Sequence, residues 1–425
     1  MPSGVTKKMF KSFIKYYDPE IFVAAGRRIR TTVLSADELS PTERVKKIAQ
    51  LFACFKNPDK ETVLTPWRVV NMHMSDCLGG YDFYDEAHEQ MVDKPRFVDR
   101  GKVTADTFAN AGARVLEINS KTGLYPLYVT YSIFRSRCAA SSEEELDDAK
   151  LQQLWDAAVR ENVFVICKTP MAKQITRRTL AGYRDIPVNA HYFDDLINMM
   201  KNKPRQFVDR VLKPSYWKQE GVKTMKFDAV VGNPPYQVMD GGSKASATPV
   251  YNYFVEQAKE LKPNYVSMII PARWYSGGRG LDAFRESMLH DHRIRQLFDY
   301  SDSNDCFAGV DIAGGICYFL WDENHNGSCE VVNFHNGARY ETLRQLDDNK
   351  VFFRYGQALS ILNKVQQQTT EFYDSKVSSQ KPFGLRTYVV PTEDGDIQLR
   401  YNKGIGPFKR ELVTGAFDWI DKWKV

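Results

Sequence analysis

The stretch FDAVVGNPPYQ, residues 227–237, is the part of the sequence that decides its interpretation. Its first half, Phe227 to Gly232, is a short apolar run rich in valine, which predicts a buried β-strand. Asn233-Pro234-Pro235-Tyr236 follows at once. A proline after Asn233 favours an extended backbone at that residue, and the fixed φ angles of both prolines limit the turn to few shapes. The stretch therefore predicts a rigid loop at the carboxyl end of a strand, with one amide side chain and one aromatic ring.

These groups suit the activation of an amine attached to an aromatic ring, whose lone pair is delocalised. The Asn233 side-chain oxygen can accept a hydrogen bond from one N–H, and a main-chain carbonyl, most simply that of Pro234, can accept from the other. Tyr236 offers a flat face on which a planar base can stack. A base inside a duplex cannot reach such a loop, so base flipping is implied. The alternative is an Asn-Pro-Pro turn that only ends a strand.

Short β-rich runs alternate with helical patterns on both sides of this loop. Such alternation predicts an α/β fold with a mostly parallel sheet covered by helices on both faces. Ligands of these sheets bind at the carboxyl ends of the strands. A further helix is predicted from Ser40, with Ser40 as its cap and Pro41 at its first position. The other predicted elements are strands at 114–118, 163–167 and 265–270 and a helix at 251–261.

The composition narrows the class of protein. The chain has 425 residues, of which 43% are hydrophobic, enough for a large core and for two or three domains. The longest apolar run, 312–321, is too short for a membrane span, and the N-terminus lacks a signal peptide, so we expect a cytoplasmic protein without membrane contact. The seven scattered cysteines form no CxxC pair. We expect them to be core residues rather than disulfide partners or metal ligands, and we expect no metal.

The net charge of +5 is small, but the positive charge is unevenly distributed. Residues 1–60 and 168–226 each carry a clear excess of Lys and Arg over Asp and Glu. Two basic regions on an otherwise balanced chain favour a polyanionic partner such as nucleic acid. The alternative is that both are ordinary solvated helical faces.

FDAVVGNPPYQ resembles the catalytic motif of N6-adenine DNA methyltransferases, and its surroundings are similar to the Eco57I-like restriction–modification methylases. The resemblance covers roughly residues 40–335, and its motif order is that of the gamma subclass. It implies a Rossmann-like S-adenosylmethionine-dependent methyltransferase fold that methylates adenine in double-stranded DNA at a specific site. The segments that carry it, besides the catalytic motif, are 56–74, 115–128, 164–180, 191–196, and 305–321 as the late strand pair beside the base pocket, with a fainter likeness at 381–387.

The resemblance also implies roles for individual residues. Asn233, Pro234, Pro235 and Tyr236 would form the catalytic loop. Tyr236 and Phe307 would hold the flipped base, and Arg279 would reach phosphate. The residues expected to bind the cofactor are Thr65, Pro66, Glu117, Asn119, Thr122, Gly123 and Asp194.

Two positions depart from the family's pattern. In the turn Glu117 to Gly123, only its first and last residues keep the expected acidic and small character, so we expect cofactor binding with altered contacts. Lys168 follows the second strand, where an acid normally binds the ribose hydroxyls. Because lysine cannot accept a hydrogen bond, the ribose contacts must differ. One alternative function is therefore a non-catalytic DNA-binding subunit, and another is methylation of rRNA or of a protein glutamine.

The expected organisation has three parts: a helical N-terminal region at 1–60, the methyltransferase domain at 61–335, and a linker with the start of a DNA target-recognition domain at 336–425. The last stretch, FDWIDKWKV, is apolar and aromatic. We expect such side chains to be covered by further protein. The sequence thus predicts a truncated recognition domain, or one completed by a second polypeptide, and a restriction endonuclease is a possible partner.

Overall fold

The computed structural model describes residues 18–57, 63–141, 146–239, 247–335, 337–348, 352–368, 389–391 and 397–399, with Thr6, Lys8 and Lys11. The chain divides into two compact units, Met1–Gly356 and Gln357–Val425. In the second unit the structure describes most of α13 (Gly356–Gln366) and an antiparallel pair, β14 (Val389–Pro391) and β15 (Ile397–Leu399). The fainter likeness predicted at 381–387 lies outside the described residues.

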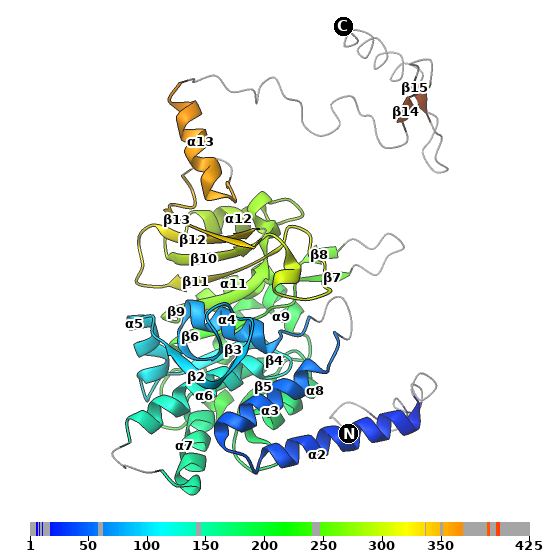
Figure 1. The fold of residues 1–425 in the computed structure, drawn as a ribbon, viewed down its shortest axis with the longest axis vertical. Helices are drawn as coiled ribbons and strands as arrows, with labels where there is room; N and C mark the ends of the chain where they lie inside the picture. Colours follow the sequence, from blue (N-terminus) through cyan, green and yellow to red (C-terminus); the bar gives the residue numbers. More distant parts are fainter. Residues whose placement is uncertain are drawn as a thin grey trace. The chain divides into compact units, whose positions relative to one another are not determined.

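The first unit is built on a nine-stranded sheet with the strand order β13-β12-β10-β11-β9-β6-β3-β4-β5 (Figure 1). The strands from β9 to β5 in this order are parallel, whereas β11 runs antiparallel to both of its neighbours. The predicted α/β class with a mostly parallel sheet is confirmed. The strands are β3 (Val115–Ser120), β4 (Val163–Cys167), β5 (Asn189–Tyr192), β6 (Ala229–Gly232), β9 (Tyr265–Pro271), β10 (Ile294–Tyr300), β11 (Ile316–Asp322), β12 (Cys329–His335) and β13 (Ala338–Arg344).

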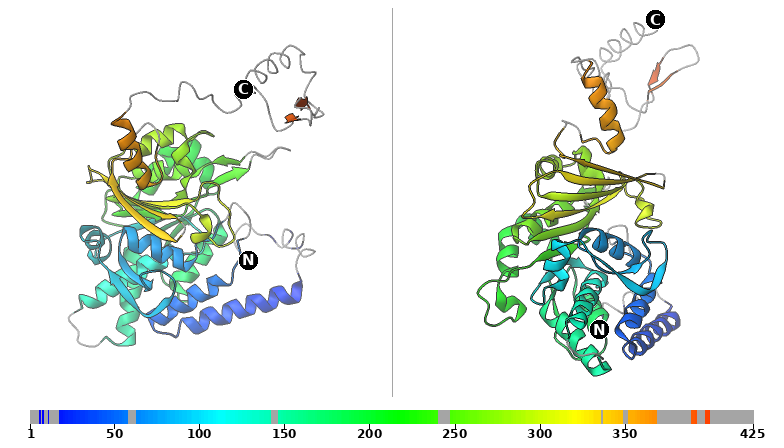
Figure 2. Two further views of the ribbon diagram at one scale, coloured as in Figure 1. Left: turned by 45° about the horizontal axis from the view of Figure 1, so that its top comes forward. Right: turned by 60° about the vertical axis from the view of Figure 1, so that its left-hand side comes forward.

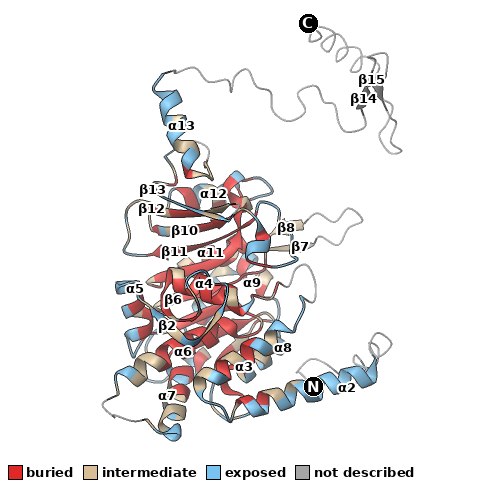
Figure 3. Cartoon of the chain, viewed as in Figure 1, coloured by how far each residue is buried: buried red, intermediate tan, exposed pale blue. Residues whose placement is uncertain are grey.

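Helices cover both faces of this sheet because its central strands are apolar on both sides. Alternate residues of one strand enter different cores: Val163 and Val165 belong to one, Phe164 and Ile166 to the other. Figure 3 shows buried residues throughout the centre of this unit. The first core is covered by α3 (Pro41–Ala53), α4 (Trp67–Cys77), α6 (Leu124–Ala139), α7 (Asp148–Glu161) and α8 (Pro170–Ala181), and the second by α9 (Leu196–Asn202), α10 (Pro204–Val211), α11 (Tyr251–Glu260) and α12 (Asp282–Leu289).

Smaller elements complete the unit. The predicted cap of α3 is confirmed, since the Ser40 side chain accepts a hydrogen bond from the Glu43 amide. Helix α2 (Pro19–Ala36) packs on α3. The remaining elements are the hairpins β1 (Gly80–Tyr84) with β2 (Met91–Val98) and β7 (Gln237–Met239) with β8 (Ala247–Pro249), and the short helices α5 (Lys102–Thr104), η2 (Ala105–Ala109), η3 (Pro214–Trp217), η4 (Ala272–Ser276) and η5 (Ser303–Asp305).

The predicted boundaries differ from the observed ones in two places. The described residues 18–57 pack in the first unit, because the apolar face of α3 is buried in the sheet's core. The second boundary lies after Gly356, not after residue 335. β13 continues the sheet by pairing with β12, and Phe352 packs on Tyr275, with ring centroids 4.5 Å apart.

One predicted strand pair also differs. Residues 305–321 contain β11 except for its last residue, but they do not contain its partner. That partner, β10, precedes them, and the two strands run antiparallel (yellow-green to yellow in Figure 2). The intervening residues form a loop that contains Phe307. All seven cysteines are free thiols. Within the described residues, the helices are too short or too polar to cross a membrane, and no group of His, Cys, Asp and Glu is arranged to hold a metal ion.

Candidate active site

The site begins where β6 ends. A Cβ atom on Gly232 would lie 2.5 Å from the main-chain oxygen of Ile118 in β3, so only glycine permits this close approach of the two strands. Asn233 comes next and is 3% exposed. The two prolines that follow are buried as well. The predicted catalytic loop therefore stands at the carboxyl ends of β6 and β3, the edge where α/β sheets bind their ligands.

The side-chain amide of Asn233 is held in one orientation. Its Nδ2 donates a hydrogen bond of 2.9 Å to Oγ1 of Thr65, in the segment before α4. Its Oδ1 is buried and has no hydrogen-bond partner among the described residues. A buried amide oxygen without a partner is unfavourable in the free protein, but it is an acceptor ready for a ligand N–H.

The main chain of Asn233 is held from the turn after β3. Its carbonyl oxygen accepts hydrogen bonds from Asn119 Nδ2 at 2.8 Å and from Lys121 Nζ at 3.4 Å. Lys121 Nζ also donates to Val63 O at 2.8 Å, so one ammonium group joins three segments of the chain. Asn119 adopts a φ of +75°, the left-handed conformation that asparagine tolerates better than most residues.

The turn that ends at Gly123 departs from the glycine-rich pattern of the resembling enzymes, and Lys121 lies within it. Gly123, with a φ of +79°, caps α6, and a Cβ there would lie 3.0 Å from Thr176 Cα. Lys121 was not among the predicted site residues. In the sequence, only its place in a turn where the resembling enzymes prefer small residues sets it apart. In the structure, its long side chain reaches the main chain of Asn233.

A cavity of about 670 Å³ opens beside this turn. Its floor is formed by residues 119–122, by Lys168 and Thr169 after β4, and by Pro235 of the catalytic loop. Its walls are apolar side chains of α2, α3 and α8, among them Val33, Phe52 and Ile175. The segments that the sequence assigned to cofactor binding after β3 and β4 thus line one cavity.

A second cavity, of about 620 Å³, lies next to the first and shares Leu64 and Thr122 with it. Thr65, Pro66 and Phe307 line this second cavity. Phe307 is 2% exposed, so much of its ring also packs in the core. Tyr236 is half-buried, and its hydroxyl has no hydrogen-bond partner among the described residues. Burial raises the pKa of this hydroxyl well above its usual range.

Glu117, the predicted acid of β3, is 5% exposed. Burial raises its pKa to about 8, which the nearby Ser120 and Lys121 only partly oppose. One of its carboxyl oxygens, Oε2, lacks a hydrogen-bond partner among the described residues, as does Oδ1 of Asn119. Two further buried polar atoms thus lie unpaired at the carboxyl end of β3, close to the catalytic loop.

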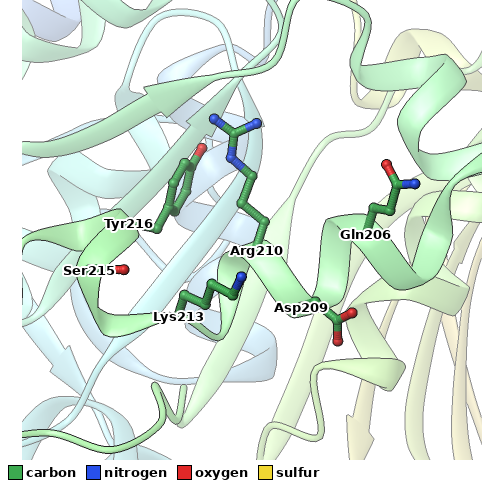
Figure 4. A pocket seen from close by; sticks show the side chains of 6 residues that line it. All are labelled: Gln206, Asp209, Arg210, Lys213, Ser215 and Tyr216. Carbon is green, nitrogen blue, oxygen red and sulfur yellow. The ribbon is translucent and has the colours of Figure 1, made fainter.

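Two predicted residues lie elsewhere. Asp194 lines a separate cavity of about 450 Å³ after β5, together with His191, Arg210 and Tyr216. Figure 4 shows the neighbouring hollow, where the Arg210 guanidinium lies beside the Tyr216 ring. Arg279 has a φ of +52° in an exposed loop after η4 and lines neither of the two cavities beside Asn233.

Comparison with known proteins finds relatives of part of this chain. Residues 161–307, which include β4, the catalytic loop and Phe307, match the Eco57I restriction-modification methylase family. These residues form an Eco57I-type methylase domain. A segment of 106 residues is 41% identical to an uncharacterised adenine-specific methylase of Mycoplasma pneumoniae. That segment is 24% of this chain and 25% of the relative's length.

Solved structures resemble the chain more distantly. A modification subunit of a putative type I restriction enzyme from Vibrio vulnificus YJ016 is 11% identical, with a TM-score of 0.42, over 84% of this chain and 64% of that one. A type I restriction-modification methyltransferase subunit from Streptococcus thermophilus is also 11% identical, with a TM-score of 0.39, over 78% of this chain and 58% of that one.

Proposed function

We propose that the Eco57I-type domain takes part in transferring a methyl group from S-adenosylmethionine to the N6 amine of an adenine flipped out of DNA. The observation that carries the proposal is the bare, buried Oδ1 of Asn233, whose amide is oriented by Thr65. An aromatic amine has two N–H bonds to donate, and accepting both localises its lone pair. The resemblance of the surrounding motifs to N6-adenine methyltransferases supports this choice of acceptor.

Several residues of this chain would contact the adenine during methyl transfer. Asn233 Oδ1 accepts one N–H of the amine. The carbonyl oxygen of Asn233 is already occupied by Asn119 and Lys121, so we assign the second acceptor to the carbonyl of Pro234. Tyr236 stacks on the base, and Phe307 closes the adjoining cavity. No strong base is needed, because the amine loses its proton after it has been methylated.

The residues beside the loop fit a polar nucleoside-like cofactor. The cavity of about 670 Å³ touches the catalytic loop at Pro235. Asn119 lines it, and the unpaired Oδ1 of Asn119 and Oε2 of Glu117 are the hydrogen-bond acceptors that we assign to the cofactor. When bound there, S-adenosylmethionine supplies the electrophilic methyl group. Thr122 and Gly123 complete the turn, whereas contacts from Asp194 and Arg279 stay predictions.

Double-stranded DNA is the partner that we propose for the outer surface. Helix α2 presents Arg27, Arg28 and Arg30 toward solvent, and such groups pair with phosphates without reading sequence. The same proposal includes methylation at a specific site. It also includes two protein partners, namely a second polypeptide that completes a recognition domain and a restriction endonuclease.

The test is methyl transfer from labelled S-adenosylmethionine by the full chain, offered DNA duplexes, rRNA and protein in parallel. We expect the label in DNA, as N6-methyladenine after digestion and mass spectrometry. Because the chain can require a partner for DNA recognition, duplexes with a pre-flipped, unpaired adenine are included. Label in rRNA or protein alone would contradict the choice of substrate.

A non-catalytic DNA-binding subunit is the second candidate, and one observation favours it. Among the described residues that line the larger cavity, none is acidic, so the usual carboxylate partner of the ribose is missing. Calorimetric titration with S-adenosylmethionine separates the two candidates. A folded sample that binds DNA but no cofactor would support the second.

A further inference from the structure

Part of the basic region 168–226 gathers away from the catalytic loop, around Arg210 in α10. Two hollows of about 450 and 480 Å³ meet there, and Arg210 and Tyr216 line both of them. Neither hollow shares a lining residue with the two cavities beside Asn233. The proposed methyl transfer therefore gives no role to this surface, which we call the Arg210 surface.

The guanidinium of Arg210 is held by aromatic rings rather than by an acid. Its central carbon lies 5.1 Å from the ring centres of both Phe193 and Tyr216. Tyr216 is itself stacked on His191, with ring centroids 4.2 Å apart. No described residue forms a hydrogen bond or an ion pair with the Arg210 side chain, and the Asp209 carboxylate points away from it (Figure 4). A guanidinium fixed in this way keeps its N–H donors for a ligand.

Three lysines extend the positive charge on both sides of Arg210. Lys173 and Lys203 line one hollow, and Lys213 lines the other. The ammonium groups of these lysines form no hydrogen bond or ion pair within the part of the chain that the structure describes. The four cations thus lie along two joined hollows, at the carboxyl end of β5 and over α10.

Acids in the same hollows do not reverse the positive potential. These acids are Asp194, Asp195 and Asp209. His191, which lines one hollow, is a probe of the sum of the charges. Burial lowers its pKa to about 4, and the charges that lower it further are those of Lys173, Arg210 and Lys218. The potential at His191 is therefore dominated by cations.

A row of cations along two joined hollows suits a ligand with repeated negative charges, because successive phosphates of a nucleic-acid backbone can each meet one cation. An arginine whose donors are unused can bind two oxygens of one phosphate. Building on the proposed function, which supplies the partner, we propose that the Arg210 surface is a second contact for the backbone of duplex DNA, outside the active site. This contact strengthens DNA binding but reads no sequence.

The test is binding of the full chain to a fluorescent DNA duplex, measured by anisotropy at several salt concentrations. Arg210→Met removes the charge and the donors. We expect it to weaken binding several-fold and to reduce the slope of log affinity against log salt by about one, the effect of one lost phosphate contact. Adding Lys213→Met is expected to reduce the slope further. Arg210→Lys is expected to keep the slope but lose part of the affinity, because lysine lacks the bidentate fork.

Lys226→Met is the matched control, because it removes one charge from the same basic region. Lys226 is exposed, precedes β6 and lines neither hollow. We expect this variant to keep the wild-type slope and affinity. Calorimetric titration with S-adenosylmethionine is expected to give the same dissociation constant for wild type and for every variant, since the Arg210 surface lies apart from the proposed cofactor cavity.

A salt slope unchanged in Arg210→Met and in the double variant would overturn the inference and leave the proposed function intact. Weaker binding of S-adenosylmethionine by Arg210→Met would overturn it too, because the hollow would then belong to the cofactor. Inorganic phosphate is titrated in parallel. Phosphate binding that is lost in Arg210→Met, with an unchanged DNA slope, would show a site for a small anion instead. A folded chain that binds no DNA would contradict both the inference and the proposed partner.

Discussion

Thr65 Oγ1 and Asn233 Nδ2 are joined by a hydrogen bond of 2.9 Å between residues 168 positions apart in the chain. The bond uses the amide nitrogen, and the amide oxygen has no hydrogen-bond partner among the described residues. Without it, the Asn233 side chain could turn over and present a donor where the proposed chemistry needs an acceptor. Thr65, which the resemblance assigned to the cofactor, also orients the Asn233 side chain, and its contact with the cofactor stays a prediction.

Replacing Thr65 with Val is expected to lower kcat for methyl transfer by about 3- to 10-fold, the usual range for one neutral hydrogen bond. Thr65→Ser keeps the hydroxyl and is expected to restore most of the rate. Dissociation constants for cofactor should change little in both variants. A large loss of cofactor affinity in Thr65→Val, with kcat unchanged, would show that Thr65 binds the cofactor instead of orienting Asn233.

Asn233→Ala removes the acceptor itself. We expect turnover to fall by about 10²–10³, the usual effect of losing one preorganised transition-state hydrogen bond. The thermal midpoint should fall only slightly, because the hydrogen bond from Nδ2 to Thr65 is lost while Oδ1 has no partner among the described residues. Asn202→Ala, at an exposed position in α9, is the matched control and should keep wild-type turnover. Near wild-type turnover of Asn233→Ala would disprove the proposed mechanism.

Tyr236 separates stacking from hydroxyl chemistry. Its hydroxyl is buried beside the Asn233 side chain and has no hydrogen-bond partner of good geometry among the described residues, so Tyr236→Phe should keep most activity and most stability. Tyr236→Ala removes a stacking contact of about 1–3 kcal/mol and should weaken the hold on the flipped base. Fluorescence of 2-aminopurine at the target position, with turnover in parallel, measures both. An equally severe loss in the two variants would point to a role for the hydroxyl.

Gly232→Ala tests the close approach of β6 to β3. The added Cβ would lie 2.5 Å from the Ile118 main-chain oxygen, so the strands must move apart. We expect a loss of about 1–3 kcal/mol in the free energy of unfolding, measured by chemical denaturation. Gly26→Ala is the control, since its Cβ meets nothing within 4 Å in helix α2. That variant should gain up to about 1 kcal/mol from helix propensity.

Glu117 makes stability depend on pH. Burial raises its pKa from 4.5 to about 8, so between these pH values the folded chain holds a proton that the unfolded chain has lost. The contribution of Glu117 to stability therefore falls as pH rises from about 4.5 to about 8. Glu117→Gln cannot titrate there, and its free energy of unfolding relative to wild type should rise over this range.

Denaturation at several pH values between 5 and 8 measures this effect, with Glu220→Gln at an exposed position as the control. The Glu220 variant should follow the wild-type pH profile. Parallel pH profiles for wild type and Glu117→Gln would show that Glu117 is ionised in the folded protein.

Local sequence determined the elements and the functional groups of the predicted catalytic loop. Apolar runs rich in valine or isoleucine, with turn residues after them, predicted β4, β6 and β9, because an apolar run of that length suits a strand buried on both faces. Ser40 and Pro41 predicted the start of α3 through capping, which acts within one helical turn. The two prolines restrict the loop after Asn233 through their own rings. Strand patterning, helix capping and proline restriction all act between residues that are neighbours in the chain, so they can be read from the sequence.

Only the tertiary structure decided which distant groups meet. The ammonium of Lys121 donates hydrogen bonds to the main-chain oxygens of Val63 and Asn233. The hydroxyl of Thr65 accepts a hydrogen bond from the Asn233 amide and so orients it. No local sequence pattern predicts these contacts. The addition of β13 to the sheet likewise depends on pairing with β12 rather than on its own residues, most of which are exposed. The cationic residues that line the larger cavity come from the segment after α3, from α8 and from the turns after β3 and β4. Such features are set by how strands are ordered and how helices pack across them, because that packing alone fixes which side chains share a space.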